Sequence, residues 1–94
     1  MTEKQVEQRL VNGVKALGGT AYKFVSPGSV GAPDRLVVMP GGRVFFVELK
    51  TDNGRLSKMQ ARQMERLMEL RQQVECLYGR KDVDRFLKKL EALV

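Results

Sequence analysis

Apolar residues recur at helical spacing near the start of the chain. They lie three or four residues apart, on one side of a helix, at Val6, Leu10, Val14 and Leu17. Thr2 and Gln5 have the spacing of a capping box, and Gly18-Gly19 interrupts the apolar series. The pattern predicts a helix over residues 3–17.

The next part of the chain reads as strands and turns. Residues 20–25 form a short strand candidate, and residues 26–32 (SPGSVGA) are typical of a loop. Residues 34–39 and 43–50 then predict two strands around the turn sequence Pro40-Gly41-Gly42. The second of these strands is apolar on both faces, as is typical of an interior strand.

The last part of the chain alternates between helix and strand. Ser57 and Gln60 again have capping-box spacing, which predicts a helix to about Gln72 with Met64, Leu67 and Met68 buried. Residues 74–78 predict a strand and residues 81–93 an amphipathic helix. The predicted order is α-β-β-β-α-β-α, an α/β (α+β) mixed sheet flanked by helices in a single domain over residues 1–94.

The turn sequence fixes the register of the central strand pair. Pro40 suits the second position of a type I turn that ends on a left-handed Gly42. Met39 then faces Arg43, and Asp34 faces Glu48. A two-residue Gly-Gly turn would instead place Asp34 opposite Leu49, on the other face; the proline favours the first register.

Two opposed carboxylates repel each other, yet they suit a divalent cation. Lys50 lies on the same face as Glu48, because side chains two residues apart point the same way. The plainer interpretation is an edge strand whose end carries solvated charges, with Lys50 pairing to Asp34 or Glu48. The apolar strand that carries Glu48 favours paired or metal-bound charges instead.

Composition narrows the chemistry. The chain has no histidine and only one cysteine, Cys76, which excludes an internal disulfide, zinc-finger sites and Ser-His or Cys-His catalysis. A metal site must therefore use oxygen ligands, which favours Mg²⁺ or Mn²⁺. The net charge of +6 favours a polyanionic partner, although a basic surface also serves solubility. We expect no membrane span, no organic cofactor, and an intracellular location.

The motifs together resemble a known family. Gly31-Ala32-Pro33-Asp34, Glu48-Leu49-Lys50 and the later Leu56-Ser57 with Gln60 are similar to the PD-(D/E)XK nuclease superfamily, and most of all to its small VRR-NUC (virus-type replication-repair nuclease) domains, which phages encode as stand-alone proteins. The resemblance covers essentially the whole chain. It implies a restriction-endonuclease-like core.

The resemblance also implies roles for individual residues. Asp34, Glu48 and the backbone carbonyl of Leu49 would ligate the metal, and Lys50 would orient the attacking water or stabilise developing phosphate charge. Gln60 would support the site, unless it serves only the cap at Ser57.

The family also places a glutamate of the first helix at the site. Glu3 and Glu7 compete for this role, and we favour Glu7, which lies deeper in the helix; either could instead be a solvated helix charge.

Contacts to DNA are expected from five further residues, Lys23, Ser29, Arg35, Arg55 and Lys58. The alternative interpretation is that they form a solvated basic surface.

The resemblance implies hydrolysis of DNA phosphodiesters with Mg²⁺ or Mn²⁺, by a homodimer that selects branched DNA such as Holliday junctions, in the cytoplasm of a bacterium or a phage-infected host. A basic DNA-binding module that keeps the fold without catalysis is the main alternative. A helical interaction module is disfavoured by the central hairpin.

Overall fold

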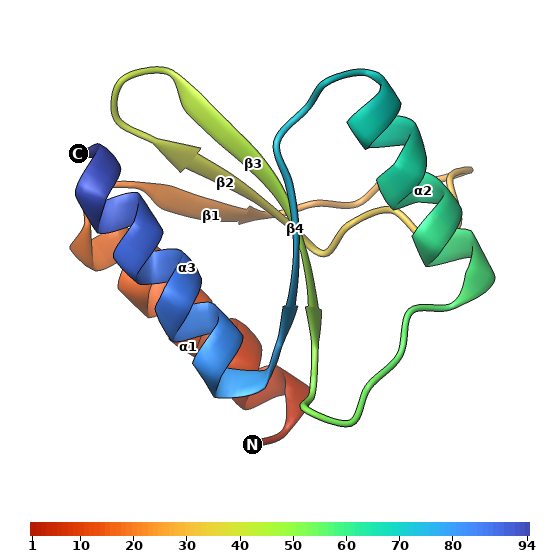
Figure 1. Ribbon diagram of the computed structural model, residues 1–94, viewed down its shortest axis with the longest axis horizontal. Helices are drawn as coiled ribbons and strands as arrows, with labels where there is room; N and C mark the ends of the chain where they lie inside the picture. Colours follow the sequence, from red (N-terminus) through yellow and green to blue (C-terminus); the bar gives the residue numbers. More distant parts are fainter.

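A four-stranded mixed sheet organises the protein, described for residues 1–94 by a computed structural model (Figure 1). The strands β1 (Thr20–Lys23), β2 (Arg35–Met39) and β3 (Arg43–Lys50) are antiparallel neighbours, and β4 (Val74–Tyr78) runs parallel to β3 on its other side. The β3 strand is therefore interior, and its charged end is not at a sheet edge. The predicted element order and mixed sheet are confirmed.

The register of the central hairpin is as predicted from the turn. Met39 pairs with Arg43 and Arg35 with Val47. Asp34, which precedes Arg35, therefore falls opposite Glu48, which follows Val47. The turn type is a correction. Gly41 has φ +85° and Gly42 φ +79°, whereas the third position of a type I turn needs negative φ; a positive φ there fits a type II turn with Pro40 second.

Two helices cover one face of the sheet. The helices α1 (Glu3–Ala16) and α3 (Gly79–Leu93) lie side by side there (Figure 1). Their apolar sides and alternate strand residues, such as Phe45 and Val47, form a core cluster of 13 buried residues. At the helix crossing, a Cβ on Gly13 would overlap the end of the Leu87 side chain, so glycine leaves room for that side chain.

The opposite face of the sheet is only partly covered, by α2 (Lys58–Glu69) (Figure 1). Met64 is the one buried residue of α2, and Leu67 is half-buried. Met68 is 55% exposed, so the prediction that it is buried is wrong. Because α2 covers only part of this face, Tyr22 and Val44 remain exposed.

Element ends differ from the predictions where local geometry decides them. The α2 helix ends at Glu69, and Arg71 adopts a left-handed φ of +60° while its N–H donates to the Met68 carbonyl. A non-glycine residue seldom takes this conformation, so an arginine at this position is not recognisable as a helix stop before Gln72. The α3 helix begins at Gly79, directly after β4, two residues earlier than predicted.

None of the three helices combines the length and apolar character needed to cross a membrane.

Candidate active site

Two carboxylates face each other where β2 begins and β3 ends. Asp34 directly precedes β2, and one of its carboxylate oxygens, Oδ2, accepts a hydrogen bond from the Leu49 backbone N–H at 2.9 Å. This bond holds Asp34 against the Glu48-Leu49 peptide. The hairpin register and this side-chain bond together place the predicted pair on the sheet face that α2 partly covers.

Glu48 is the one buried charged residue of the chain, at 1% exposure. Burial, and then the neighbouring charge of Asp34, raises the pKa of Glu48 to about 8. Desolvation disfavours the carboxylate, and a second negative charge adds to that cost. The Lys50 ammonium acts in the other direction. A carboxyl with this pKa holds a proton at neutral pH unless a cation takes the proton's place.

Gln60 connects the N-terminus of α2 to Glu48. Its Oε1 accepts from the Ser57 N–H at 2.8 Å, and the Ser57 hydroxyl accepts from the Gln60 N–H at 3.1 Å, which completes the capping box. Its Nε2 then donates to Glu48 Oε2 at 2.9 Å. The two roles that the sequence left as alternatives are therefore combined, and the cap fixes which end of the amide faces Glu48.

Lys50 lies on the same face as Glu48, two residues further along β3. Its ammonium is 3.8 Å from Glu48 Oε2, and its side chain is 16% exposed. At that distance the pair is a loose charge contact, and Nζ keeps donor capacity for a water molecule or a phosphate oxygen.

The loop before Asp34 is seated on α2. Gly31 has φ +86°, and a Cβ at this position would lie 2.6 to 2.8 Å from backbone atoms of Met59 and Gln60. Only glycine allows both the left-handed backbone and this approach. Pro33 is buried, and the Asp34 carbonyl accepts from the Phe24 N–H at 2.9 Å. The packing of Gly31 on α2 and the hydrogen bond of Gln60 to Glu48 thus link the loop, the helix cap and the two carboxylates.

The fold does not bring Glu7, the glutamate favoured from the sequence, into this cluster. Its Oε2 accepts from Arg35 Nε at 2.9 Å. Glu3 is the glutamate of α1 whose charge contributes to the raised pKa of Glu48. In Figure 1 the N-terminal end of α1 lies near the end of β3, which accounts for that effect.

Arg35, predicted from the sequence to contact DNA, is engaged within the protein. Its side chain is 17% exposed, and its guanidinium is committed to Glu7 and to the Ala21 carbonyl, 3.1 Å from Nη1. Arg35 thereby links Glu7 of α1 to Ala21 of β1. The other predicted contact residues are exposed and form no ion pair: Lys23, Arg55 and Lys58, together with the exposed Ser29.

Comparison with known proteins identifies the family. The family model of the VRR-NUC domain matches residues 2–81. The chain belongs to the VRR-NUC nuclease family. A curated relative, "Putative nuclease p44" of Acyrthosiphon pisum secondary endosymbiont phage 1, is 47% identical over 72 residues, which are 77% of each chain. A solved structure described as a VRR_NUC domain superposes with a TM-score of 0.86 and 31% identity, covering 94% of this chain and 96% of its own.

The site of this chain offers a hard divalent cation two neighbouring carboxylates, Asp34 and Glu48. Glu48 Oε1 is buried and has no hydrogen-bond partner, while Oε2 receives Gln60. An orphaned buried carboxylate oxygen beside a second carboxylate is costly without a cation. The chain gathers no group of three His, Cys, Asp or Glu side chains fit for a metal. Backbone oxygen and water would therefore complete the coordination of Mg²⁺ or Mn²⁺, both of which accept such ligands.

Two residues of β4 also face the site and were not predicted to do so. Cys76 pairs with Glu48 and Tyr78 with Lys50 across the parallel β3–β4 ladder, so all four side chains share a face. Burial is the main cause that raises the pKa of the Cys76 thiol. No sequence signal places β4 beside β3, because a parallel pairing is made by the tertiary fold and not by a turn.

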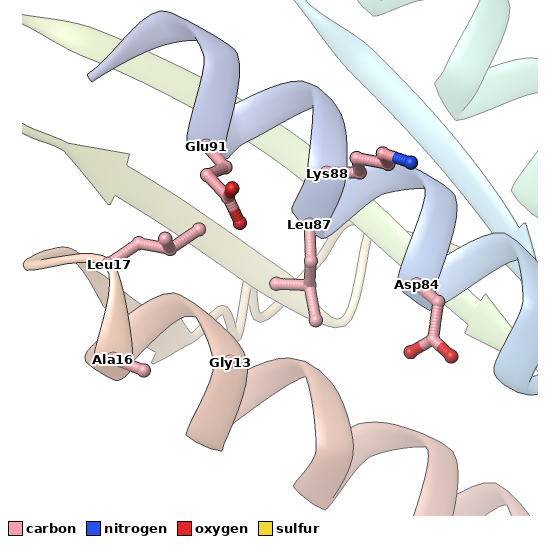
Figure 2. A pocket seen from close by; sticks show the side chains of 7 residues that line it. All are labelled: Gly13, Ala16, Leu17, Asp84, Leu87, Lys88 and Glu91. Carbon is pink, nitrogen blue, oxygen red and sulfur yellow. The ribbon is translucent and has the colours of Figure 1, made fainter.

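The groove between α1 and α3 is separate from this site. It is lined by Gly13, Ala16, Leu17, Asp84, Leu87, Lys88 and Glu91 (Figure 2). These residues belong to the two helices on the other face of the sheet. Asp84 is already engaged there by Arg9, whose Nε lies 2.7 Å from Oδ1.

Proposed function

We propose that this VRR-NUC protein is a Mg²⁺- or Mn²⁺-dependent endonuclease that hydrolyses DNA phosphodiester bonds. The observation that carries the proposal is Glu48 Oε1, a buried carboxylate oxygen without a partner that shares its site with Asp34. Lys50 lies on the same face and supplies a cationic donor. Without histidine in the chain, this oxygen-rich set is the one reactive constellation that the fold gathers.

The residues divide the work between holding and reacting. Asp34 is fixed by the Leu49 N–H and Glu48 by Gln60, so both carboxylates are pre-oriented and no side-chain entropy is lost when substrate binds. A bound divalent ion would supply Lewis-acid charge and acidify a water ligand. Lys50 donates to the attacking water or to a non-bridging phosphate oxygen, where negative charge grows in the transition state.

We propose a homodimer acting on branched DNA as the finer form of this function. The three helices of the domain are packed on the two faces of the sheet, which favours recognition of DNA shape and backbone over readout of base edges. The exposed Tyr22 and Val44 on the partly covered sheet face give a second copy an apolar surface to cover.

The test compares cleavage of four DNA forms by metal-free protein to which Mg²⁺ or Mn²⁺ is added. The substrates are a four-way junction, a linear duplex, a single strand and a covalently closed circle. We expect wild type to nick the circle, to prefer the junction, and to be inactive with a chelator. Asp34→Ala and Lys50→Ala should each lose about 10²-fold or more in rate.

Asn53→Ala, an exposed change in the loop that follows β3, is the matched control and should cleave like wild type. Absence of cleavage by wild type, or equal cleavage by the Asp34 and Lys50 variants, would refute the nuclease proposal. Cleavage of linear but not circular DNA would refute endonuclease action specifically.

A non-catalytic DNA-binding module is the alternative, and metal binding distinguishes the two. Calorimetric titration with Mn²⁺ should show a site in wild type that Glu48→Gln removes. The alternative predicts no such site, with DNA binding that is indifferent to metal.

A further inference from the structure

The outer side of α2 carries a row of cations that the proposed site does not use. Arg62 is two residues from both Gln60 and Met64, which face the sheet, so it points to the opposite side of the helix. Lys58 and Arg66 lie four residues before and after Arg62 and share that side. All three side chains are exposed.

These cations have no ion-pair partner, in contrast to three of the cations of α3. On α3, Arg80 and Arg85 contact Asp84 and Asp82 at 3.6 and 3.1 Å, and Lys89 contacts Glu75 at 2.8 Å. None of the ion pairs of the protein involves a cation of residues 55–71.

Residues 55–71 hold five cations, Arg55, Lys58, Arg62, Arg66 and Arg71, against the two acids Glu65 and Glu69. Half of the chain's net charge of +6 is thus concentrated in this short segment. The two glutamates reduce the local field but form no ion pair with the arginines.

The row begins at the site and leads away from it. Gln60, in the first turn of α2, bonds to Glu48, and Gly31 packs against the same turn. From Lys58 to Arg66 the helix rises about 12 Å at 1.5 Å per residue. Phosphates of one DNA strand recur every 3.4 Å along the duplex axis, so about three phosphates fit beside this length of helix.

We propose that Arg62 and Arg66 bind the phosphate backbone of the duplex arm that flanks the scissile phosphate. They extend along α2 the contact surface that begins with Arg55 and Lys58 at its N-terminal end. The inference rests on the proposed nuclease function and gives α2 two roles: its inner side holds Glu48, and its outer side holds DNA. Such contacts position the substrate without reading its sequence.

The experiment measures binding to a fluorescein-labelled linear duplex by anisotropy, in a chelator so that no cleavage occurs. Wild type is compared with the double variant Arg62→Gln/Arg66→Gln. Glutamine retains helix propensity, and both positions are exposed, so folding is expected to be unchanged and is checked by thermal melting. The matched control is Lys81→Gln/Lys88→Gln, which removes the same charge from exposed, unpaired positions of α3.

Each phosphate contact contributes about 0.9 to the log–log salt slope, so the Arg62/Arg66 variant should have a slope smaller by about 1.8. Between about 50 and 200 mM NaCl, wild type should therefore lose about 12-fold more affinity than this variant. The α3 control should keep the wild-type slope. Equal slopes for all three proteins, or an equal reduction in both variants, would overturn the surface on α2.

Cleavage assays keep this inference distinct from the proposed function. If wild type cleaves with Mn²⁺ but the Arg62/Arg66 variant keeps the wild-type slope, the surface is wrong and the nuclease proposal stands. If the slopes differ as expected but wild type never cleaves, the surface stands and the nuclease proposal falls. Failure of wild type to bind the duplex would overturn the surface.

Discussion

The two faces of β3 are formed by alternating residues and have different roles. On one face, Phe45, Val47 and Leu49 are at most 1% exposed beneath α1 and α3. On the other, Val44 is 37% exposed, and Glu48 is as deeply buried as any core residue. The first face holds the fold together, and the second holds a charge that costs stability.

The difference shows how a small domain can stay folded although its reactive site costs stability. A carboxyl whose pKa is raised by burial opposes folding, and the sealed face must offset that cost. Because successive side chains of a strand point to opposite faces, β3 supplies both faces and attaches the site to an interior strand of the sheet. Four predictions sharpen this comparison.

The largest effect is expected from truncating adjacent phenylalanines of β3. Phe45→Ala removes a fully buried ring that packs edge-to-face on Phe86, with 5.4 Å between the ring centroids. The change should lower the free energy of unfolding by about 3–5 kcal/mol. Phe46→Ala removes a half-buried ring on the site face and should cost about half as much. Urea denaturation measures both. Similar losses would contradict the view that one face carries the stability.

Glu48→Gln tests the cost of the site itself. The pKa of Glu48 in the folded protein, about 8, lies above its ordinary 4.5. As pH rises from 4.5 to 8 the unfolded state therefore loses this proton first, and metal-free wild type loses stability. The slope attributable to Glu48 is at most about 1.4 kcal/mol per pH unit, about 2–4 kcal/mol across that window.

Urea denaturation at several pH values, compared with Glu48→Gln, isolates this contribution, because the other carboxyls are common to both proteins. The variant should be the more stable at pH 8 and should not cleave DNA. A stability difference independent of pH would rule out the raised pKa as its cause.

Two methionines of α2 test how firmly this helix is packed on the site face. Met64 is 6% exposed, and Met64→Ala should cost about 2 kcal/mol. Met68→Ala, at a position 55% exposed, should change stability by about 0.5 kcal/mol or less. Equal losses in thermal or urea unfolding would show that Met68 is also buried in solution, by contacts that a single chain does not provide.

The last comparison is between the two capping boxes, which differ only in what lies beyond them. Gln5 and Gln60 have the same local role with Thr2 and Ser57, so replacing either by Ala should cost about 1 kcal/mol. Gln60 also donates to Glu48, and its loss should weaken Mn²⁺ binding about 10–100-fold. Gln5→Ala should leave the metal affinity at the wild-type value; a matching loss there would contradict a specific role for Gln60.

Local chemistry was sufficient to predict much of the fold and part of the site. Turn residues predicted the pairing of Asp34 with Glu48, and capping-box spacing predicted both helix starts, because these interactions join residues close in sequence. The ion pair of Glu7 with Arg35 was not predicted, because the two residues lie 28 positions apart. A solvent-facing cation and an ion-paired one also look alike in sequence.

The sequence by itself determined the order of elements, the face shared by Glu48 and Lys50, and the oxygen-only chemistry that follows from having no histidine. Only the tertiary structure decided that β4 lies beside β3, that Gln60 spans from its cap to Glu48, and that Glu3 rather than Glu7 influences that carboxyl. The physical reason is range. Periodicity and turn geometry act over a few residues, whereas burial and electrostatic fields depend on every segment that packs around a group.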